Sequence, residues 1–144
     1  AAVRGAMVRN LNIIRQDGDT HGLAGGVDAP CWGEAAVEIV KPAEDGAVDG
    51  EPCIMGCIFR VSGRWGMCVR ATCASPQIAR NRFLACRWGV VLVGAKGRIE
   101  DNEFIGVGET AVTLIGGAPW VQRNTISDCG GEGVLVAGDC SAVF

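Results

Sequence analysis

A repeated pattern in the C-terminal half of the chain limits its fold more than any other feature. The pattern is an apolar residue, two variable residues, Asn, one variable residue and a second apolar residue, and its copies are Ile78 to Phe83, Ile99 to Phe104 and Val121 to Ile126. A second apolar stretch follows each copy, at Gly89 to Leu92, Ala111 to Leu114 and Gly133 to Val136. Successive Asn residues are 21 and then 22 residues apart. A period of this size predicts a solenoid, in which each repeat buries its apolar face against its neighbours.

The repeat is built from short strands rather than from helices. The segments 99–101, 103–105 and 111–115 are rich in apolar and β-branched residues, with Gly or Asn between them. Six glycines lie between residues 94 and 117, and each costs about 1 kcal/mol relative to Ala inside a helix. We therefore predict an all-β, right-handed parallel β-helix of about five coils, with successive coils ~4.8 Å apart.

Stacking such coils places like residues above like. The predicted inward columns are Ile78, Ile99 and Val121; Phe83, Phe104 and Ile126; Val90, Val112 and Val134; and Leu92, Leu114 and Val136. Asn81, Asn102 and Asn124 fall at the bend between the first two strands, where a short amide tolerates left-handed backbone and can hydrogen-bond along the solenoid. Cys57 takes the place of this Asn one coil earlier. We interpret these three asparagines as a structural ladder.

The length of 144 residues fits one domain, 1–144. Residues 53–140 form the regular coils, and residues 1–52 form an irregular first coil whose strands are expected near Met7 to Ile13 and Gly33 to Ile39. Two loop insertions, 16–32 and 41–52, are expected to project from this first coil. Neither end of the repeat looks capped, so we expect the chain to be part of a longer solenoid.

Composition and charge argue against two classes of partner. The net charge of −3 and the pI near 5.1 provide no overall positive field for a phosphate backbone, so we expect no nucleic acid partner. The longest apolar runs are far shorter than the roughly 20 residues of a membrane span, so we expect no membrane insertion. The N-terminus shows no signal-peptide pattern, which leaves the compartment open.

The repeat over about residues 53–140 resembles the right-handed β-helix repeats of the pectate-lyase-like superfamily, especially the carbohydrate-binding and sugar-hydrolase-type repeats. Similar repeats form the β-helix region of certain F-box proteins, of periplasmic copper-enzyme maturation proteins and of alginate epimerases. The F-box resemblance implies a scaffold that recruits a protein substrate, and the others imply carbohydrate chemistry. Paired Asp motifs with a Gly-His-Gly segment, and the Asp-Pro-His-Glu motif of the epimerases, are not found in this sequence.

The clearest carboxylate cluster is Glu100, Asp101 and Glu103. A calcium or catalytic site would need carboxylates at matching positions of adjacent coils. Those positions instead carry Ala79, Arg80 and Arg82 on one side, and Gln122, Arg123 and Thr125 on the other. Opposite charges therefore alternate from coil to coil, which predicts a solvated face of ion pairs worth about 0.2 to 1 kcal/mol each.

Two further groups of residues have reactive chemistry. Asp17, Asp19 and the chain's only histidine, His21, lie in a Gly-rich segment that we interpret as a solvated loop, with a metal or proton-transfer site as the alternative. The eight cysteines are interpreted first as buried free thiols, with disulfides and metal binding left open. We predict no catalytic residue, no metal ligand and no cofactor.

Arg64–Trp65 and Arg87–Trp88 are expected at the same corner of successive coils, as a tentative binding patch or as corner packing. The sequence favours a non-catalytic recognition scaffold whose partner is a protein. The alternative is a β-helix that binds or acts on a polysaccharide, with any active site outside these residues.

Overall fold

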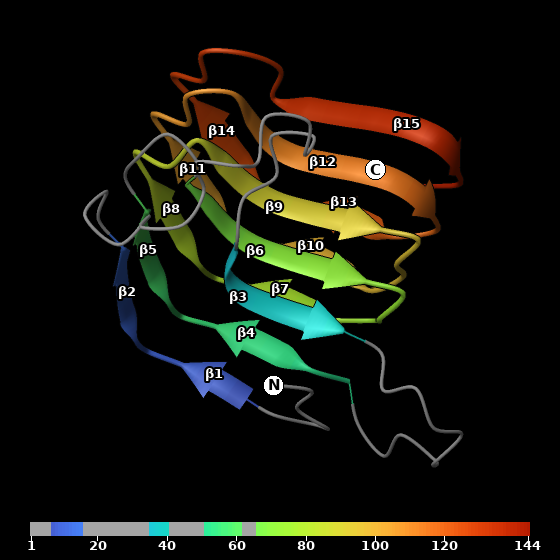
Figure 1. Ribbon diagram of the computed structural model, residues 1–144, viewed down its shortest axis with the longest axis horizontal. Helices are drawn as coiled ribbons and strands as arrows, with labels where there is room; N and C mark the ends of the chain where they lie inside the picture. Colours follow the sequence, from blue (N-terminus) through green and yellow to red (C-terminus); the bar gives the residue numbers. More distant parts are fainter. Residues whose placement is uncertain (1–6, 16–34, 41–50, 62–65) are drawn as a thin grey trace, which may run out of the picture.

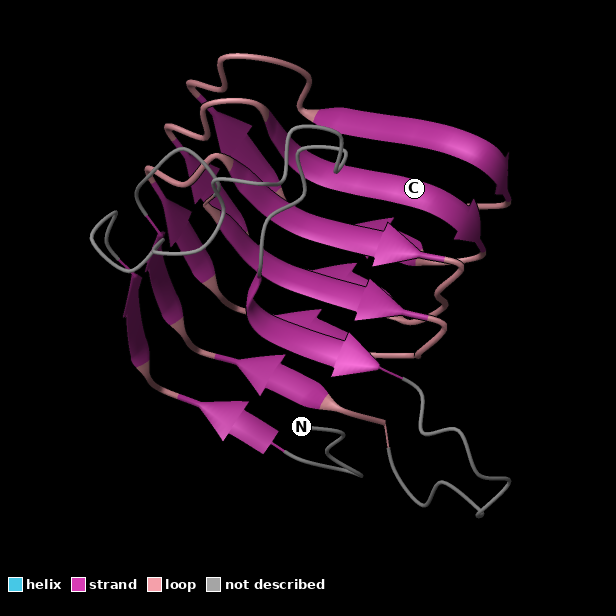
Figure 2. Ribbon diagram, viewed as in Figure 1, coloured by secondary structure: helices cyan, strands magenta, loops and turns pink. Residues whose placement is uncertain are grey.

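The computed structural model describes residues 7–15, 35–40, 51–61 and 66–144, and every regular element within them is a β-strand. The strands form three parallel sheets of five strands each. Consecutive strands of the chain lie in different sheets, while strands about 22 residues apart in sequence lie side by side (Figure 1, Figure 2). This arrangement is a parallel β-solenoid, as the repeat predicted. Its right-handed winding stays a prediction.

Each sheet takes one strand from every pass of the chain. The first sheet contains β1 (Met7–Arg9), β4 (Cys53–Met55), β7 (Gln77–Ala79), β10 (Arg98–Glu100) and β13 (Trp120–Gln122). The second contains β2 (Asn12–Arg15), β5 (Ile58–Val61), β8 (Arg82–Leu84), β11 (Glu103–Ile105) and β14 (Thr125–Ser127). The third contains β3 (Ala35–Val40), β6 (Met67–Thr72), β9 (Trp88–Val93), β12 (Thr110–Gly117) and β15 (Val134–Cys140).

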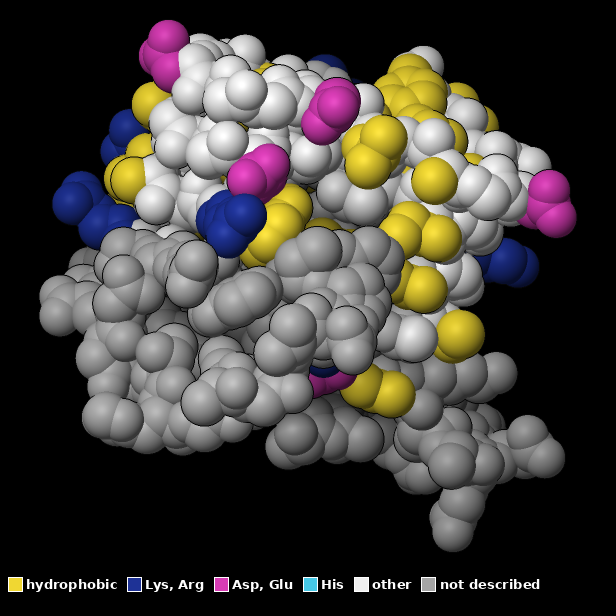
Figure 3. All heavy atoms as spheres, turned by 45° about the horizontal axis from the view of Figure 1, so that its top comes forward, with side chains coloured by type: hydrophobic (Ala, Val, Ile, Leu, Met, Phe, Trp, Pro, Cys, Tyr) yellow, Lys and Arg dark blue, Asp and Glu magenta, His cyan; other side chains and the backbone are white. Residues whose placement is uncertain are grey.

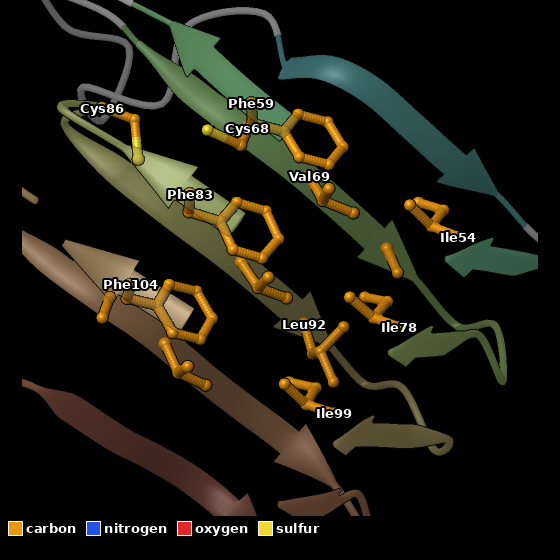
Figure 4. Packing of buried hydrophobic residues seen from close by; sticks show 14 of the residues in the cluster. Ile54, Phe59, Cys68, Val69, Ile78, Phe83, Cys86, Leu92, Ile99 and Phe104 are labelled. Carbon is orange, nitrogen blue, oxygen red and sulfur yellow. The ribbon is translucent and has the colours of Figure 1, made fainter. Parts of the chain in front are cut away.

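The predicted inward columns are confirmed by the register of the sheets. Ile99 pairs with Ile78 and Val121, and Phe104 pairs with Phe83 and Ile126. The columns that contain Val112 and Leu114 continue in the same way through the third sheet. Apart from Val136, which is 45% exposed, these side chains fill the space between the three sheets and form one continuous core (Figure 4).

The phenylalanine column is the most regular part of this core. Phe59, Phe83 and Phe104 stack with ring centroids 4.9 and 4.6 Å apart and with nearly parallel rings (Figure 4). All three rings are fully buried. Stacked aromatic pairs add about 0.5 to 1.5 kcal/mol beyond the burial of their area, so this column supports the register of the second sheet.

The bend between the first two sheets differs by one residue from the prediction. The left-handed residue is the one before the ladder position, with φ of 52° at Asn10, 55° at Arg80, 54° at Asp101 and 50° at Arg123. The asparagine itself is not left-handed. The left-handed residue donates its N–H to the next coil, as Arg80 does to the carbonyl of Glu100, and this turn sends the following Asn side chain inward.

The irregular first coil is present where the sequence placed its strands. Met7 pairs with Cys53 in β4, Asn12 with Ile58 in β5, and Ala35 with Met67 in β6. The predicted loop insertions lie outside the described residues, apart from Glu51 and Pro52.

Candidate functional site

The asparagine ladder, Asn81, Asn102 and Asn124, is a continuous hydrogen-bonded chain. Asn81 donates to Asn102 Oδ1 from both its backbone nitrogen and Nδ2, each at 3.0 Å. Asn102 repeats this pair of bonds to Asn124 Oδ1, again at 3.0 Å. Cys57, which precedes the ladder, donates its backbone N–H to Asn81 Oδ1 at 2.9 Å. These bonds satisfy buried polar groups of the bend, as a structural ladder requires.

Arg87, Trp88 and Glu109 form a second constellation, here called the Arg87–Trp88 corner. Trp88 begins β9, and the Arg87 guanidinium carbon lies 4.6 Å from the centroid of its indole. Arg87 Nη2 also donates to Glu109 Oε1 of the next coil at 3.0 Å. The carboxylate therefore holds the cation against the aromatic face, where cation–π attraction adds about 0.5 to 1 kcal/mol at an exposed site.

The predicted second half of this corner is not described, because Arg64 and Trp65 lie outside the described residues. The stacking of the two Arg–Trp pairs therefore stays a prediction. In the third sheet, Trp88 pairs with Met67 on one side and with Thr110 on the other.

A second tryptophan with an arginine neighbour was missed by the sequence analysis. Trp120 begins β13 and is 46% exposed, which makes it a large exposed apolar side chain on the first sheet. Arg98 occupies the paired position on β10, with its guanidinium carbon 5.9 Å from the indole centroid. The signal was present in the sequence, because Arg98 and Trp120 are separated by the same 22-residue step as the ladder.

The carboxylate cluster forms the ion pairs that its alternating charges predicted. Arg82 lies 2.7 Å from Glu103, and Arg123 lies 2.9 Å from Asp101. The hydrogen bond from Arg123 lowers the pKa of Asp101 below the usual carboxyl value. A carboxylate held in its ionised form by a guanidinium is poorly suited to act as a general acid near neutral pH.

The cysteines in the described part of the chain are free thiols, and these are Cys53, Cys57, Cys68, Cys73, Cys86, Cys129 and Cys140. Cys68 and Cys86 lie beside the phenylalanine column (Figure 4). Burial raises the pKa of Cys68 well above its usual value, and hydrogen bonding to Cys86 raises it further. Since the thiolate is the reactive form of cysteine, the buried Cys68 is a poor nucleophile near neutral pH.

Metal ligands do not gather in the part of the chain that the structure describes, since no three His, Cys, Asp or Glu residues there lie close enough to share an ion. The loop with Asp17, Asp19 and His21 is outside those residues. Among the described residues, no helix could cross a membrane.

The chain matches no family model, no curated protein and no solved structure.

Proposed function

We propose that this chain is a non-catalytic recognition scaffold that binds a protein partner through the Arg87–Trp88 corner. The observation that supports it best is the preorganised guanidinium, which lies 4.6 Å from the Trp88 centroid and 3.0 Å from Glu109 Oε1. Tryptophan and arginine are enriched among residues that dominate binding energy at protein interfaces. A side chain that is already oriented loses less conformational entropy when a partner binds.

The solenoid gives this corner a rigid support. Trp88 opens a strand that is paired on both sides, and the residues that follow it in β9 are buried. We further propose membership of the pectate-lyase-like superfamily, with the substrate-recruiting β-helix of F-box proteins as a functional parallel. The Asn-containing repeat supports that assignment.

A second candidate function is polysaccharide binding, and Trp120 favours it. Sugars stack on open aromatic faces, and Trp120 is 46% exposed, with Arg98 farther from its indole centroid (5.9 Å) than Arg87 is from that of Trp88 (4.6 Å). Arg98 beside Trp120 supplies hydrogen-bond donors for hydroxyl or carboxylate groups. In this alternative the binding surface is the outer face of the first sheet rather than the corner.

The proposal is tested by affinity capture with the folded wild-type chain and with Arg87→Ala, Trp88→Ala and Arg60→Ala variants. Arg60 is an exposed arginine on β5 and serves as the matched control. We expect a partner protein that is retained by the wild type and by Arg60→Ala but lost from both corner variants, and that binds the purified chain directly. Equal retention by all four proteins contradicts the proposal.

The carbohydrate alternative is tested with the same proteins plus Trp65→Ala and Trp120→Ala, on a panel of neutral and acidic polysaccharides with and without Ca²⁺. Saturable binding that is lost only in Trp120→Ala would place the binding surface on the first sheet instead of at the Arg87–Trp88 corner. Loss in Trp65→Ala and Trp88→Ala instead assigns sugar binding to the corner itself.

A further inference from the structure

Two buried thiols are in contact in the core, at the bend between the second and third sheets. Cys68 belongs to β6 and is fully buried, and Cys86 follows β8 and is 2% exposed. The Cys68 thiol is hydrogen-bonded to Cys86. Figure 4 shows both sulfur atoms beside the phenylalanine column, with the Cys68 sulfur pointing toward Cys86. The two residues come from successive coils, so a covalent bond between them would join one coil to the next.

Backbone hydrogen bonds hold these two thiols together. The N–H groups of Arg87 and Trp88 both donate to Gly66 O at 2.9 Å. Arg87 follows Cys86 directly, and Gly66 is two residues before Cys68. Strand β6 then pairs with β9 along the third sheet. Because these bonds fix both segments, a disulfide would require a small approach of two side chains and no rearrangement of the sheets.

Packing alone does not require a thiol at Cys86. This residue follows Ala85, which is left-handed with φ of 51°. In the next coil Val107 follows Gly106, which is left-handed with φ of 66°. Cys86 and Val107 are both buried in the same core cluster. An apolar valine therefore fills the same position one coil later.

The surroundings of the thiol pair favour a neutral oxidised form. No charged side chain is buried among the residues that the structure describes, and charged side chains lie at the surface, as on the face in Figure 3. A sulfinic or sulfonic acid is ionised near neutral pH and would lack a partner of opposite charge in this core. A disulfide carries no charge and can stay buried.

We propose that Cys68 and Cys86 form a redox-sensitive modification site, which a small peroxide converts from two thiols to a disulfide. The bond joins the coil that carries Arg87 and Trp88 to the coil before it. The site does not depend on the function proposed for the Arg87–Trp88 corner.

Cys86 reacts first, because it directly follows the exposed Ala85 whereas Cys68 lies within β6. Its thiolate attacks one oxygen of hydrogen peroxide, the O–O bond breaks, and hydroxide leaves and takes up the thiol proton, which gives a sulfenic acid and water. The Cys68 sulfur then attacks the Cys86 sulfur, the S–O bond breaks, and the hydroxyl group leaves as water with the Cys68 proton. Sulfur is oxidised and peroxide oxygen is reduced. Contact between the sulfurs offsets the poor nucleophilicity of Cys68.

The experiment treats the reduced chain with hydrogen peroxide, unfolds it with an alkylating reagent and digests it with trypsin. Cleavage after arginine places Cys68 as the single cysteine of peptide 65–70 and Cys86 as the single cysteine of peptide 83–87. We expect mass spectrometry to find these peptides joined, in at least about tenfold excess over any other cysteine cross-link, because proximity favours this pair. Separate alkylation of both cysteines, or sulfinic acid on either without the cross-link, overturns the proposal.

Two variants test the same site through stability. Cys86→Val removes the thiol and keeps a side chain that fits this position, and Cys53→Ala is the control at another buried cysteine. Oxidation should raise the melting temperature of the wild type and of Cys53→Ala by at least about 5 °C, because the bond closes the loop 68–86. It should leave the melting temperature of Cys86→Val unchanged. An equal shift in all three proteins, or a shift in none, overturns the proposal.

Discussion

Asn102 is a buried polar side chain that makes several hydrogen bonds within the core. It is 2% exposed, accepts two hydrogen bonds from Asn81 and donates to Ile78 O at 2.9 Å and to Asn124 Oδ1 at 3.0 Å. We predict that Asn102→Ala lowers the free energy of unfolding by about 3 kcal/mol, because it removes these bonds and leaves the buried Asn81 N–H unpaired. Urea denaturation measures the loss.

Asn124→Ala is the matched control for that prediction. Asn124 is only partly buried, and two of its donors have no partner among the described residues. Its loss also removes the acceptor of two hydrogen bonds from Asn102, but at a partly buried site, so it should cost less than the loss of Asn102, about 1 to 2 kcal/mol. Similar losses of unfolding free energy in Asn102→Ala and Asn124→Ala would show that the contribution of a ladder residue depends neither on its burial nor on whether the ladder continues beyond it.

Two glycines in one column of the third sheet make a second test at the residue scale. A Cβ at Gly89 would overlap the carbonyl oxygen of Ala111 and lie 2.7 Å from the Phe104 ring, whereas a Cβ at Gly133 would meet only Ile126, at an ordinary 3.6 Å. We predict that Gly89→Ala destabilises by about 1 to 3 kcal/mol through overpacking and that Gly133→Ala is close to neutral. Thermal melts of both variants check this, and a neutral Gly89→Ala would contradict the packing described for this column.

Some features of individual residues could be predicted from the sequence and others could not. Asn81, Asn102 and Asn124 were predictable because the same side chain recurs at one step. The left-handed residues at the bend were harder to predict, because Arg80 and Arg123 have side chains that give no sign of positive φ. Their conformation follows from the turn that joins two sheets and not from local preference.

At the scale of elements, the register of the sheets follows from the repeat, and the register then decides which charges meet. Charges that alternate in sequence at a step of one coil become neighbours across adjacent strands, which is why the pairs of Asp101 with Arg123 and of Glu103 with Arg82 were predictable. Trp120 and Arg98 are also one coil apart and therefore lie on adjacent strands. The pair was not predicted because it is not repeated in neighbouring coils.

The pair of Asp101 and Arg123 predicts a pH dependence. Its hydrogen bond lowers the pKa of Asp101, so the stabilisation from this pair is present above the usual carboxyl pKa and is lost as the pH falls through the lowered value. NMR titration of the carboxyl carbon should give a pKa below that of an unpaired aspartate. In Arg123→Gln the value should rise toward the usual one. An unchanged value in this variant would show that the bond does not persist in solution.

At the scale of the whole molecule, each coil contacts only its neighbours, so local stability should depend on position along the solenoid. The third sheet provides an internal comparison, since β9 and β12 each lie between two strands while β15 is paired only with β12. The side chains of β12 from Thr110 to Leu114 are buried, whereas those of β15 are largely exposed. The last coil is therefore expected to open while the inner coils stay folded.

Hydrogen exchange followed by mass spectrometry tests this expectation on the unmodified chain. We predict that backbone amides of β15 exchange at least about a hundredfold faster than those of β12 and β9, because opening the last coil exposes little additional apolar surface. Equal protection of β9, β12 and β15 would mean that the solenoid opens as a single cooperative unit.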